Sequence, residues 1–384
     1  MKPISKNIFL IVPEFSFFMS HRFELIKGLL NDGISIDIIT HYNNFDKLPN
    51  IPGLNFIFLD SHRQSFNIIN LLKLSPMLRR LIITKNPDFI YAISHRSILL
   101  STLASLFLRK RLIFAISGMG SLFSETTSQN RIKIRFMLLK NMLLIFYRFL
   151  IPKKRSTFIV QNSEDRDIIV NERISTIDSI YIIPGNGIKD SFFYSKSPNI
   201  DGKIVFTMIS RLLKDKGVIE FLKAANYLVS KYPEFEARLY GGTDVSNFNS
   251  LSIKDIKEYL NPNVLYMGFH PDIRDSVIDS SVIVLPSYRE GFSKVLMEAQ
   301  ACSRPVITSD TAGCRDAIIA SKTGKLVEPQ NTESLIEAME SFLEDKSTIL
   351  DYSKEAYLHA SKCFTVQQSV ELHQRIFKEI EGNI

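Results

Sequence analysis

The sequence predicts an α/β protein with two Rossmann-like, doubly wound domains that face a cleft. Its 384 residues are about twice the length of a typical domain. Short, continuously apolar segments alternate with segments of helical periodicity, which is typical of parallel sheets covered by helices on both faces. The alternation restarts after a linker rich in Ser, Pro and Asn at residues 194–202. A hydrophobic content of 45% allows two sizeable cores.

Seven buried strands are predicted in the first half, and helices alternate with them. The strands are expected at residues 6–13, 34–40, 54–60, 87–95, 111–118, 156–162 and 179–185, and helices at 21–33, 66–86 and 97–110. In the first helix Phe23, Ile26 and Leu30 share one face, and Gly33 favours the helix end. The apolar run at 6–13 is too short for a signal peptide and is followed by Glu14.

The second half repeats the pattern. Strands are expected at 202–210, 236–242, 264–269, 280–287 and 305–310, and helices at 217–233 and 292–301. The segment 369–383 is amphipathic and long enough to cross back onto the first domain. We therefore expect domains at 1–190 and 191–365, and a crossover helix within 366–384.

Positive charge is concentrated in the first half. Residues 1–190 hold 25 Lys and Arg against 14 Asp and Glu, whereas the remainder holds 22 against 26. Within 61–160 the counts are 17 and 2. This imbalance indicates an anionic partner for the first domain: nucleic acid, a phospholipid surface or a phosphorylated substrate. The three cysteines are too few and too widely spaced for a disulfide framework, which suits a reducing cytoplasm.

Two glutamates follow the predicted strand at 280–287. In an open α/β sheet, ligands bind beyond the carboxyl ends of the strands, where Glu290 lies. Gly291 permits a tight turn, and the first N–H groups of the helix at 292–301 can receive phosphate oxygens. Glu298 comes about two turns after Glu290, so both carboxylates can face one ligand and accept hydrogen bonds from sugar hydroxyls. The alternative is that Glu290 caps the helix and Glu298 is a solvated helix residue.

Several segments resemble the retaining glycosyltransferases of family 4, which have the GT-B fold. The motif E-G-F-x-x-x-x-x-E at 290–298, with "TGKLVEP" after it, is similar to that family's signature. "SRLLKDKG" (210–217) resembles its Arg-x-x-x-x-Lys element, and "YIIPGNGIKDSFF" (181–193) resembles the segment between its domains. "FFMSHRFELIKGLLNDGISIDIIT" (17–40) resembles the opening of one branch, so the likeness covers nearly the whole chain.

The resemblance implies a donor site in the second domain. Glu298 would bind the ribose hydroxyls of a nucleotide sugar, for which a UDP-sugar is favoured. Glu290 would contact the hydroxyls of the donor sugar. The backbone N–H groups of Phe292, Ser293 and Lys294 would lie beside it.

The resemblance also assigns the cations of this site. Arg211 and Lys216 would bind the diphosphate and replace the charge of a metal, so no metal or other cofactor is expected. Two fixed cations also favour the departure of a nucleoside diphosphate on electrostatic grounds, although either residue could be a solvated loop cation. Asp165 and Asp167 look like the Asp-x-Asp of metal-dependent glycosyltransferases, but we interpret them as the first turn of a helix that Ser163 caps.

The first domain is expected to hold the acceptor. His95 and Arg96 lie between a strand and a helix, and Gly118 and Gly120 follow the next strand. Arg96 and the helix N-terminus make an anion site, whereas His95 is either an acceptor contact or a structural residue. This pairing resembles the branch that extends polyprenyl-diphosphate-linked sugars. Ser117 stands where many relatives carry a histidine, so no general base is assigned. Front-face attack, in which the leaving phosphate takes the acceptor proton, needs none.

A glycine-rich phosphate loop that other relatives carry near the N-terminus is missing here. The segment "PEFSFFMSHR" (13–22) stands in its place. We expect His21 and Arg22 to act differently at this edge of the site, and no role is assigned to them.

The segment 131–155 is strongly basic and apolar. Lys140 and Arg148 interrupt its apolar core, so it is a poor transmembrane span. Basic residues interleaved with large apolar ones favour a helix lying in an anionic membrane interface, to which the helix at 67–85 adds. The alternative is a core helix with a solvated basic face.

The sequence therefore predicts a retaining, metal-independent hexosyltransferase on the cytoplasmic face of the membrane. It would move a hexose or N-acetylhexosamine to a lipid-diphosphate-linked saccharide in O-antigen or capsule assembly. A GT-B sugar-nucleotide epimerase would lack the 290–298 pattern. A nicotinamide dehydrogenase would need G-x-G-x-x-G after the first strand. A non-catalytic membrane or nucleic-acid-binding protein is a further alternative, but residues 61–160 contain no recognised nucleic-acid-binding module.

Overall fold

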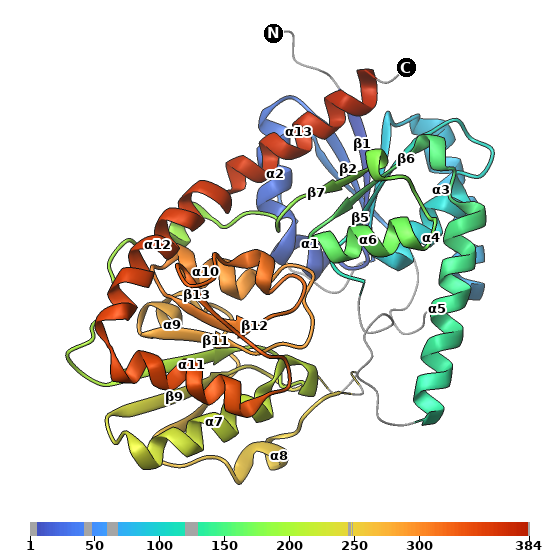
Figure 1. The fold of residues 1–384 in the computed structure, drawn as a ribbon. Coiled ribbons are helices and arrows are strands. Elements are labelled where there is room, and N and C mark those ends of the chain that lie inside the picture. The colour runs from blue at the N-terminus through green and yellow to red at the C-terminus, as the bar shows by residue number, and fades with distance from the viewer. Residues whose placement is uncertain are drawn as a thin grey trace. The chain divides into compact units, whose positions relative to one another are not determined.

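The computed structural model describes residues 6–41, 48–59, 68–119, 130–244, 247 and 249–382. The chain forms two compact units, drawn in Figure 1. The first comprises Met1–Gly187 and Val366–Ile384, and the second comprises Ile188–Thr365.

A parallel sheet of seven strands forms the first unit, in the order β3-β2-β1-β4-β5-β6-β7. The strands are β1 (Asn7–Ile11), β2 (Ser35–Thr40), β3 (Leu54–Phe58), β4 (Phe89–Ile93), β5 (Arg111–Ile116), β6 (Ser156–Val160) and β7 (Ile180–Ile182). Continuous apolar runs suit strands that are buried on both faces, and all five residues of β4 are buried. The strand order reverses between β1 and β4, which makes their carboxyl ends the expected place for a ligand.

Helices cover both faces of this sheet. They are α1 (Phe15–His21), α2 (Phe23–Asn31), α3 (Ile68–Lys85), α4 (His95–Ala104), α5 (Asn130–Leu150), α6 (Ser163–Asn171) and α13 (Val366–Gly382). One core gathers apolar side chains from α3, α4 and α5, and the core on the other face gathers them from α1, α2 and α13. The C-terminal helix therefore packs on the first unit, as the sequence predicted, beside α2 (Figure 1).

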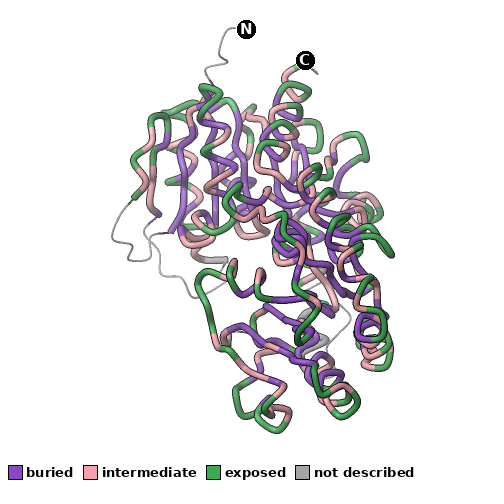
Figure 2. The backbone as a smooth tube through the Cα atoms, turned by 90° about the vertical axis from the view of Figure 1, so that its left-hand side faces the viewer, coloured by how far each residue is buried: buried purple, intermediate pink, exposed green. Residues whose placement is uncertain are grey.

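The second unit has a parallel sheet of six strands in the order β10-β9-β8-β11-β12-β13. The strands are β8 (Ile204–Ile209), β9 (Phe235–Tyr240), β10 (Val264–Gly268), β11 (Val282–Leu285), β12 (Val306–Ser309) and β13 (Gly324–Val327). The helices are α7 (Val218–Lys231), α8 (Ile253–Lys257), α9 (Arg274–Ile278), α10 (Lys294–Ala301), α11 (Thr332–Glu344) and α12 (Ser347–Cys363). In both units the strands form the buried layer and the outward sides of the helices are exposed (Figure 2).

Some predicted element bounds are wrong. The helix expected at 97–110 begins at His95 and ends at Ala104. Beyond it, Phe107 adopts a left-handed φ of 63°, and Arg79 donates to the carbonyl oxygens of Ala104 and Leu106. These side-chain bonds hold a turn where the apolar pattern alone indicated helix.

Candidate active site

The loops after β8 and β11 form the candidate active site of the second unit. These two strands are neighbours, and the strand order reverses between them. The loop after β8 carries Arg211 and Lys216, and the loop after β11 carries Glu290. The position is thus the one where an open α/β sheet binds its ligands.

Lys216 and Glu290 form an ion pair at this edge. The distance from Lys216 Nζ to Glu290 Oε1 is 2.6 Å, and the two side chains are only 18% and 16% exposed. Partial burial reduces screening by water, so the attraction is stronger than in an ordinary surface pair. The structure therefore brings together two of the three residues to which the sequence assigned chemistry.

Close backbone contact holds the two loops together. Gly217, with φ 76°, lies where an added Cβ would be 2.2 Å from the carbonyl oxygen of Pro286. The backbone N–H of Tyr288 donates to the carbonyl oxygen of Asp215 at 2.9 Å, and its hydroxyl donates to Glu220 Oε1 at 2.7 Å. Tyr288 and Glu220 were not predicted as site residues, because no motif marks them.

The loop after β12 supports the Glu290 loop from its other side. Gly313 has φ 72°, and a Cβ there would lie 2.5 Å from the carbonyl oxygen of Glu290 and 2.4 Å from that of Gly291. The N–H of Ser293, which we predicted to face the donor, donates to the carbonyl oxygen of Gly313 at 3.3 Å. The Phe292 side chain packs on Phe364 in the core, so only its backbone is placed to meet a ligand.

Glu298 lies on α10 and is only 4% exposed. Lys294, one turn earlier, contacts its carboxylate at 3.1 Å from Nζ to Oε1. Burial raises the pKa of Glu298, and Lys294 offsets part of that rise. The predicted alternative of a solvated helix residue is therefore wrong for Glu298. Ser293 caps the helix by accepting from the N–H of Leu296, so Glu290 is not the cap.

Arg211 lies in a different environment from Lys216. Its side chain is 59% exposed, and its Nη1 lies 2.7 Å from Asp244 Oδ2. Asp244 belongs to the loop after β9 and was not predicted as a site residue. Only a contact between residues 33 positions apart identifies it.

The acceptor-side residues lie at the corresponding edge of the first sheet. His95 is the first residue of α4, after Ser94, whose φ of 81° is unusual for a residue with a side chain. Its Nδ1 lies 2.7 Å from the Tyr147 hydroxyl and its Nε2 lies 3.4 Å from the carbonyl oxygen of Met119. Burial lowers the pKa of His95, so the ring is neutral near pH 7. The carbonyl requires a proton on Nε2, so Nδ1 accepts from Tyr147, and this geometry favours the structural role.

The other acceptor-side residues are placed as follows. Arg96 is half-buried in the first turn of α4. Burial lowers the pKa of His41, and the charge of Arg96 lowers it further. Gly118 follows β5 with a φ of 111°, a backbone conformation that favours glycine. Gly120 lies outside the described residues.

No cluster of three or more His, Cys, Asp or Glu suited to a metal occurs in the described ranges. Asp165 is buried, and its N–H donates to Asn162 Oδ1 at 2.8 Å. Asp167 contacts Arg166. Asp165 therefore lies in the first turn of α6, as predicted, whereas Asp167 lies beyond it. The cap is Asn162, so the prediction of Ser163 was wrong.

Comparison with known proteins identifies the class. The family model "Glycosyl transferase 4-like" matches residues 7–152, and "Glycosyl transferases group 1" matches residues 190–359. A sucrose-phosphate synthase from Thermosynechococcus elongatus superposes with a TM-score of 0.78 at 19% identity, covering 99% of this chain and 100% of that chain. HepE from Anabaena, solved with UDP and glucose, gives 0.74 at 16% identity, covering 97% and 99%. The predicted fold is confirmed, and the protein is a GT-B glycosyltransferase.

Two sequence relatives indicate which kind of glycosyltransferase this chain resembles. An N,N'-diacetylbacillosaminyl-diphospho-undecaprenol alpha-1,3-N-acetylgalactosaminyltransferase from Campylobacter jejuni is 27% identical over 370 residues, covering 94% of this chain and 96% of that protein. A UDP-Gal:alpha-D-GlcNAc-diphosphoundecaprenol alpha-1,3-galactosyltransferase from Escherichia coli is 28% identical over 209 residues, covering 50% and 53%. The chain belongs to the glycosyltransferases that combine a 4-like first domain with a group 1 second domain, which the two family models describe. The epimerase, dehydrogenase and nucleic-acid-binding alternatives are set aside.

Replacing Glu298 with Gln should stabilise the protein without ligand increasingly as pH rises. A carboxyl whose folded pKa exceeds its unfolded value of about 4.3 contributes its full stability below that value and loses it as pH rises through the folded pKa. We expect the melting temperature of Glu298→Gln minus that of the wild type to grow between pH 4.5 and 8. Asp275→Asn, at a fully solvated carboxylate, is the control and should show no such trend. A difference independent of pH would contradict the raised pKa.

Replacing Gly217 with Ala should separate the two loops. Left-handed backbone costs a residue with a side chain about 1–2 kcal/mol, and the clash with Pro286 adds to that. The free energy of unfolding should fall by about 2 kcal/mol or more. Gly202→Ala, where no atom lies within 4 Å of the added Cβ, should change it by less than about 0.5 kcal/mol. Equal effects in urea denaturation would show that the close approach of the loops is not required.

Proposed function

We propose that the protein is a retaining, metal-independent hexosyltransferase. It moves a hexose or N-acetylhexosamine from a nucleotide sugar, with UDP as the favoured nucleotide, to a saccharide linked to a lipid diphosphate. The observation that carries this proposal is the partly buried ion pair between Lys216 and Glu290, which lies where the strand order reverses. Glu290 precedes α10 by about one turn, and that helix carries the buried Glu298. The names of the C. jejuni and E. coli relatives support the lipid-diphosphate acceptor.

The donor binds by exchanging partners within this pair. The diphosphate takes the Lys216 ammonium, and the released Glu290 carboxylate accepts hydrogen bonds from hydroxyls of the donor sugar. Arg211 leaves Asp244 and joins Lys216 on the diphosphate, and Glu298 receives the ribose hydroxyls. Lys216, Arg211 and Glu290 each exchange one partner for another, so binding leaves none of these three charges unpaired in a partly buried site.

The transfer step breaks the bond between the sugar's anomeric carbon and the phosphate oxygen. The acceptor hydroxyl oxygen forms the new bond on the same face, and its proton passes to the leaving phosphate oxygen. Lys216 and Arg211 stabilise the negative charge that develops on the nucleoside diphosphate. His95 is not required as a base, in keeping with the engagement of both its ring nitrogens.

Thermal shift with nucleotide sugars tests the donor site. UDP-sugars should raise the melting temperature of the wild type in the presence of EDTA, because bound ligand stabilises the folded state. Lys216→Met and Glu298→Ala should bind at least about 30-fold more weakly, since each loses a buried charge-assisted contact. Lys231→Met, whose ion pair with Glu340 lies on α7 and α11, should bind as the wild type does. An affinity that requires a divalent cation would refute the metal-independent mechanism.

A lipid-linked acceptor requires the protein to act at a membrane, on its cytoplasmic face in this proposal. Helix α5 offers a surface that could contact that membrane. Leu138, Met142, Ile145 and Phe149 recur along one side of the helix and are all more than half exposed, Phe149 by 79%. Leu143, Leu144 and Tyr147 are buried on its other side. None of the helices in the described ranges is long and apolar enough to cross a membrane. An apolar stripe on a strongly basic region suits a helix that lies in an anionic interface.

Phe149→Ala should weaken binding to vesicles that contain anionic phospholipid by about 10- to 100-fold. That range follows from losing the burial of one aromatic side chain in the interface. Binding of the wild type should weaken with salt, because basic residues around the stripe, including Lys153 and Lys154, contribute attraction. Leu358→Ala, at an exposed apolar position on α12, should leave vesicle binding unchanged. Equal vesicle binding by all three proteins would refute the α5 surface.

A further inference from the structure

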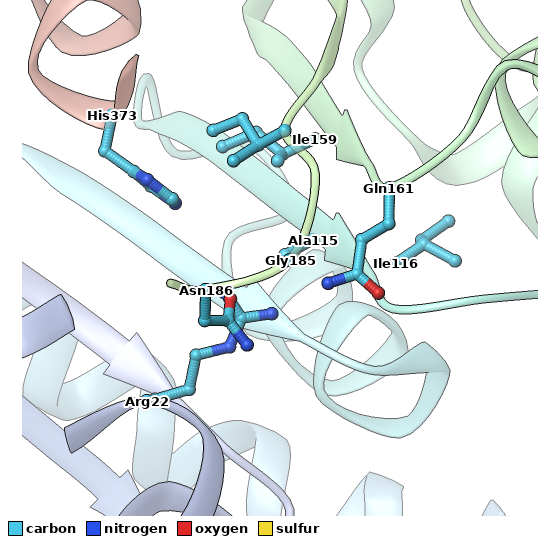
Figure 3. A pocket seen from close by; sticks show the side chains of 9 residues that line it. Arg22, Ala115, Ile116, Ile159, Gln161, Gly185, Asn186 and His373 are labelled. Atoms are coloured by element: carbon cyan, nitrogen blue, oxygen red, sulfur yellow. The ribbon is translucent and has the colours of Figure 1, made fainter. Parts of the chain in front are cut away.

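A buried arginine lies at the carboxyl edge of the first sheet. Arg22 stands between α1 and α2 and is only 3% exposed. It lines a small cavity together with Gln161 after β6, Asn186 and His373 of α13. Figure 3 shows its guanidinium directed toward Asn186, with His373 and Gln161 entering from other elements. All of these residues belong to the first unit.

The hydrogen bonds behind Arg22 fix the protonation of its neighbours. His373 Nδ1 lies 2.7 Å from the carbonyl oxygen of Ser369, so it carries a proton and donates. His373 Nε2 therefore accepts from the Tyr91 hydroxyl, at 3.0 Å. The oxygen of Tyr91 is left to accept from Arg22, with which it interacts. Burial lowers the pKa of His373 to about 4 and raises the pKa of Tyr91, so both neighbours are neutral at pH 7.

The charge of Arg22 is consequently not compensated. Its Nη2 donates to the neutral hydroxyl of Ser117 at 3.0 Å, and its Nε is buried without a partner. The described part of the chain provides no carboxylate in an ion pair with it. Burying an unpaired charge is unfavourable, and a guanidinium does not lose its proton in proteins.

A second buried arginine shows how a buried guanidinium is usually stabilised. Arg304 in the second unit is 2% exposed and donates to the carbonyl oxygens of Lys196, Cys302, Ser303 and Ile278. Its Nε is buried without a partner, as that of Arg22 is, but several partly negative oxygens surround the guanidinium, as is expected of a structural arginine. Arg22 instead has only the hydroxyls of Ser117 and Tyr91 beside it, so an anion could bind its guanidinium without displacing a negatively charged group.

We propose that Arg22, Ser117 and Asn186 bind a phosphoryl group. Ser117 is exposed, so it gives the anion access to a guanidinium that is otherwise enclosed. The Asn186 Oδ1 is also buried without a partner, and a turn of its amide presents Nδ2 as a further donor. A guanidinium fork, a hydroxyl and an amide together match the several oxygens of a phosphoryl group. The choice of this anion rests on the proposed function, in which donor and acceptor both carry a diphosphate.

Binding and stability together test this site in the full-length protein. Inorganic pyrophosphate is the probe, and Lys216→Met is the background, so that the candidate donor site does not bind it. Adding Arg22→Met should weaken pyrophosphate binding at least about 30-fold by titration calorimetry. Adding Arg79→Met, which removes a first-unit arginine that donates to carbonyl oxygens, should leave that affinity within threefold.

The melting temperature without ligand separates an anion site from a structural arginine. Removing an uncompensated charge should leave the melting temperature of Arg22→Met unchanged or raise it. Arg304→Met should lower it, because four carbonyl oxygens lose their donor. A loss in Arg22→Met equal to that in Arg304→Met would overturn the proposal, as would undiminished pyrophosphate binding.

Steady-state kinetics with Lys216 intact identify the source of the phosphoryl group. A higher KM for a short-chain prenyl-diphosphate saccharide assigns it to the acceptor, and a higher KM for the nucleotide sugar assigns it to the donor. No change in either KM would mean an adventitious anion only and would overturn the site. If nucleotide binding depended on Lys216 and Glu298 but not on Arg22, the proposed function would stand and only the Arg22 anion site would be rejected.

Discussion

The ion pair between Lys216 and Glu290 joins residues 74 positions apart, and the parallel sheet is what makes the pair possible. Each strand of such a sheet delivers its following loop to the same edge, and only where the order reverses do two loops diverge and leave room for a ligand. The constraint extends to the backbone. Gly217 and Gly313 allow the neighbouring loops to approach the Glu290 loop more closely than any side chain would permit. A small change in packing at either glycine therefore alters the distance on which the charge pair depends.

The two proposed anion sites differ in how their positive charges are paired before a ligand binds. In the second unit Lys216, Lys294 and Arg211 each have a carboxylate partner before any ligand binds. In the proposed donor binding a diphosphate enters by exchange, so its affinity is a difference between two favourable pairings. In the first unit the Arg22 guanidinium has only neutral neighbours. An anion there displaces no carboxylate, so a site of this kind binds more tightly for the same number of contacts.

The sequence predicted the frame of the fold and singled out the residues of the candidate donor loops, because strands, helices and short motifs are visible in local pattern. Continuous apolar runs identified strands such as β4. The spacing within "EGFSKVLME" drew attention to Glu290 and Glu298, and the resemblance to the family signature assigned them to a donor site. Contacts between distant segments were not predictable. Asp244 beside Arg211 and Tyr147 beside His95 depend on side-chain direction across separate elements. The cap of α6 was misassigned by one residue, because Asn162 and Ser163 are both good caps and periodicity does not separate them.

The hydrogen bonds of His95 connect the fold to the chemistry. A general base needs a ring nitrogen free to take a proton, and the environment of His95 uses one nitrogen as donor to Met119 and the other as acceptor from Tyr147. Protonating that ring would place a charge beside the buried Met119 and Tyr147, and the Tyr147 hydroxyl would lose the nitrogen to which it donates. In the proposed mechanism the proton of the acceptor hydroxyl passes instead to the departing phosphate oxygen, which gains negative charge as the sugar leaves. Cations on that phosphate speed departure but also make it a weaker base. In the proposed mechanism a lysine and an arginine share the charge over several oxygens, which suits this step better than a closely bound metal ion.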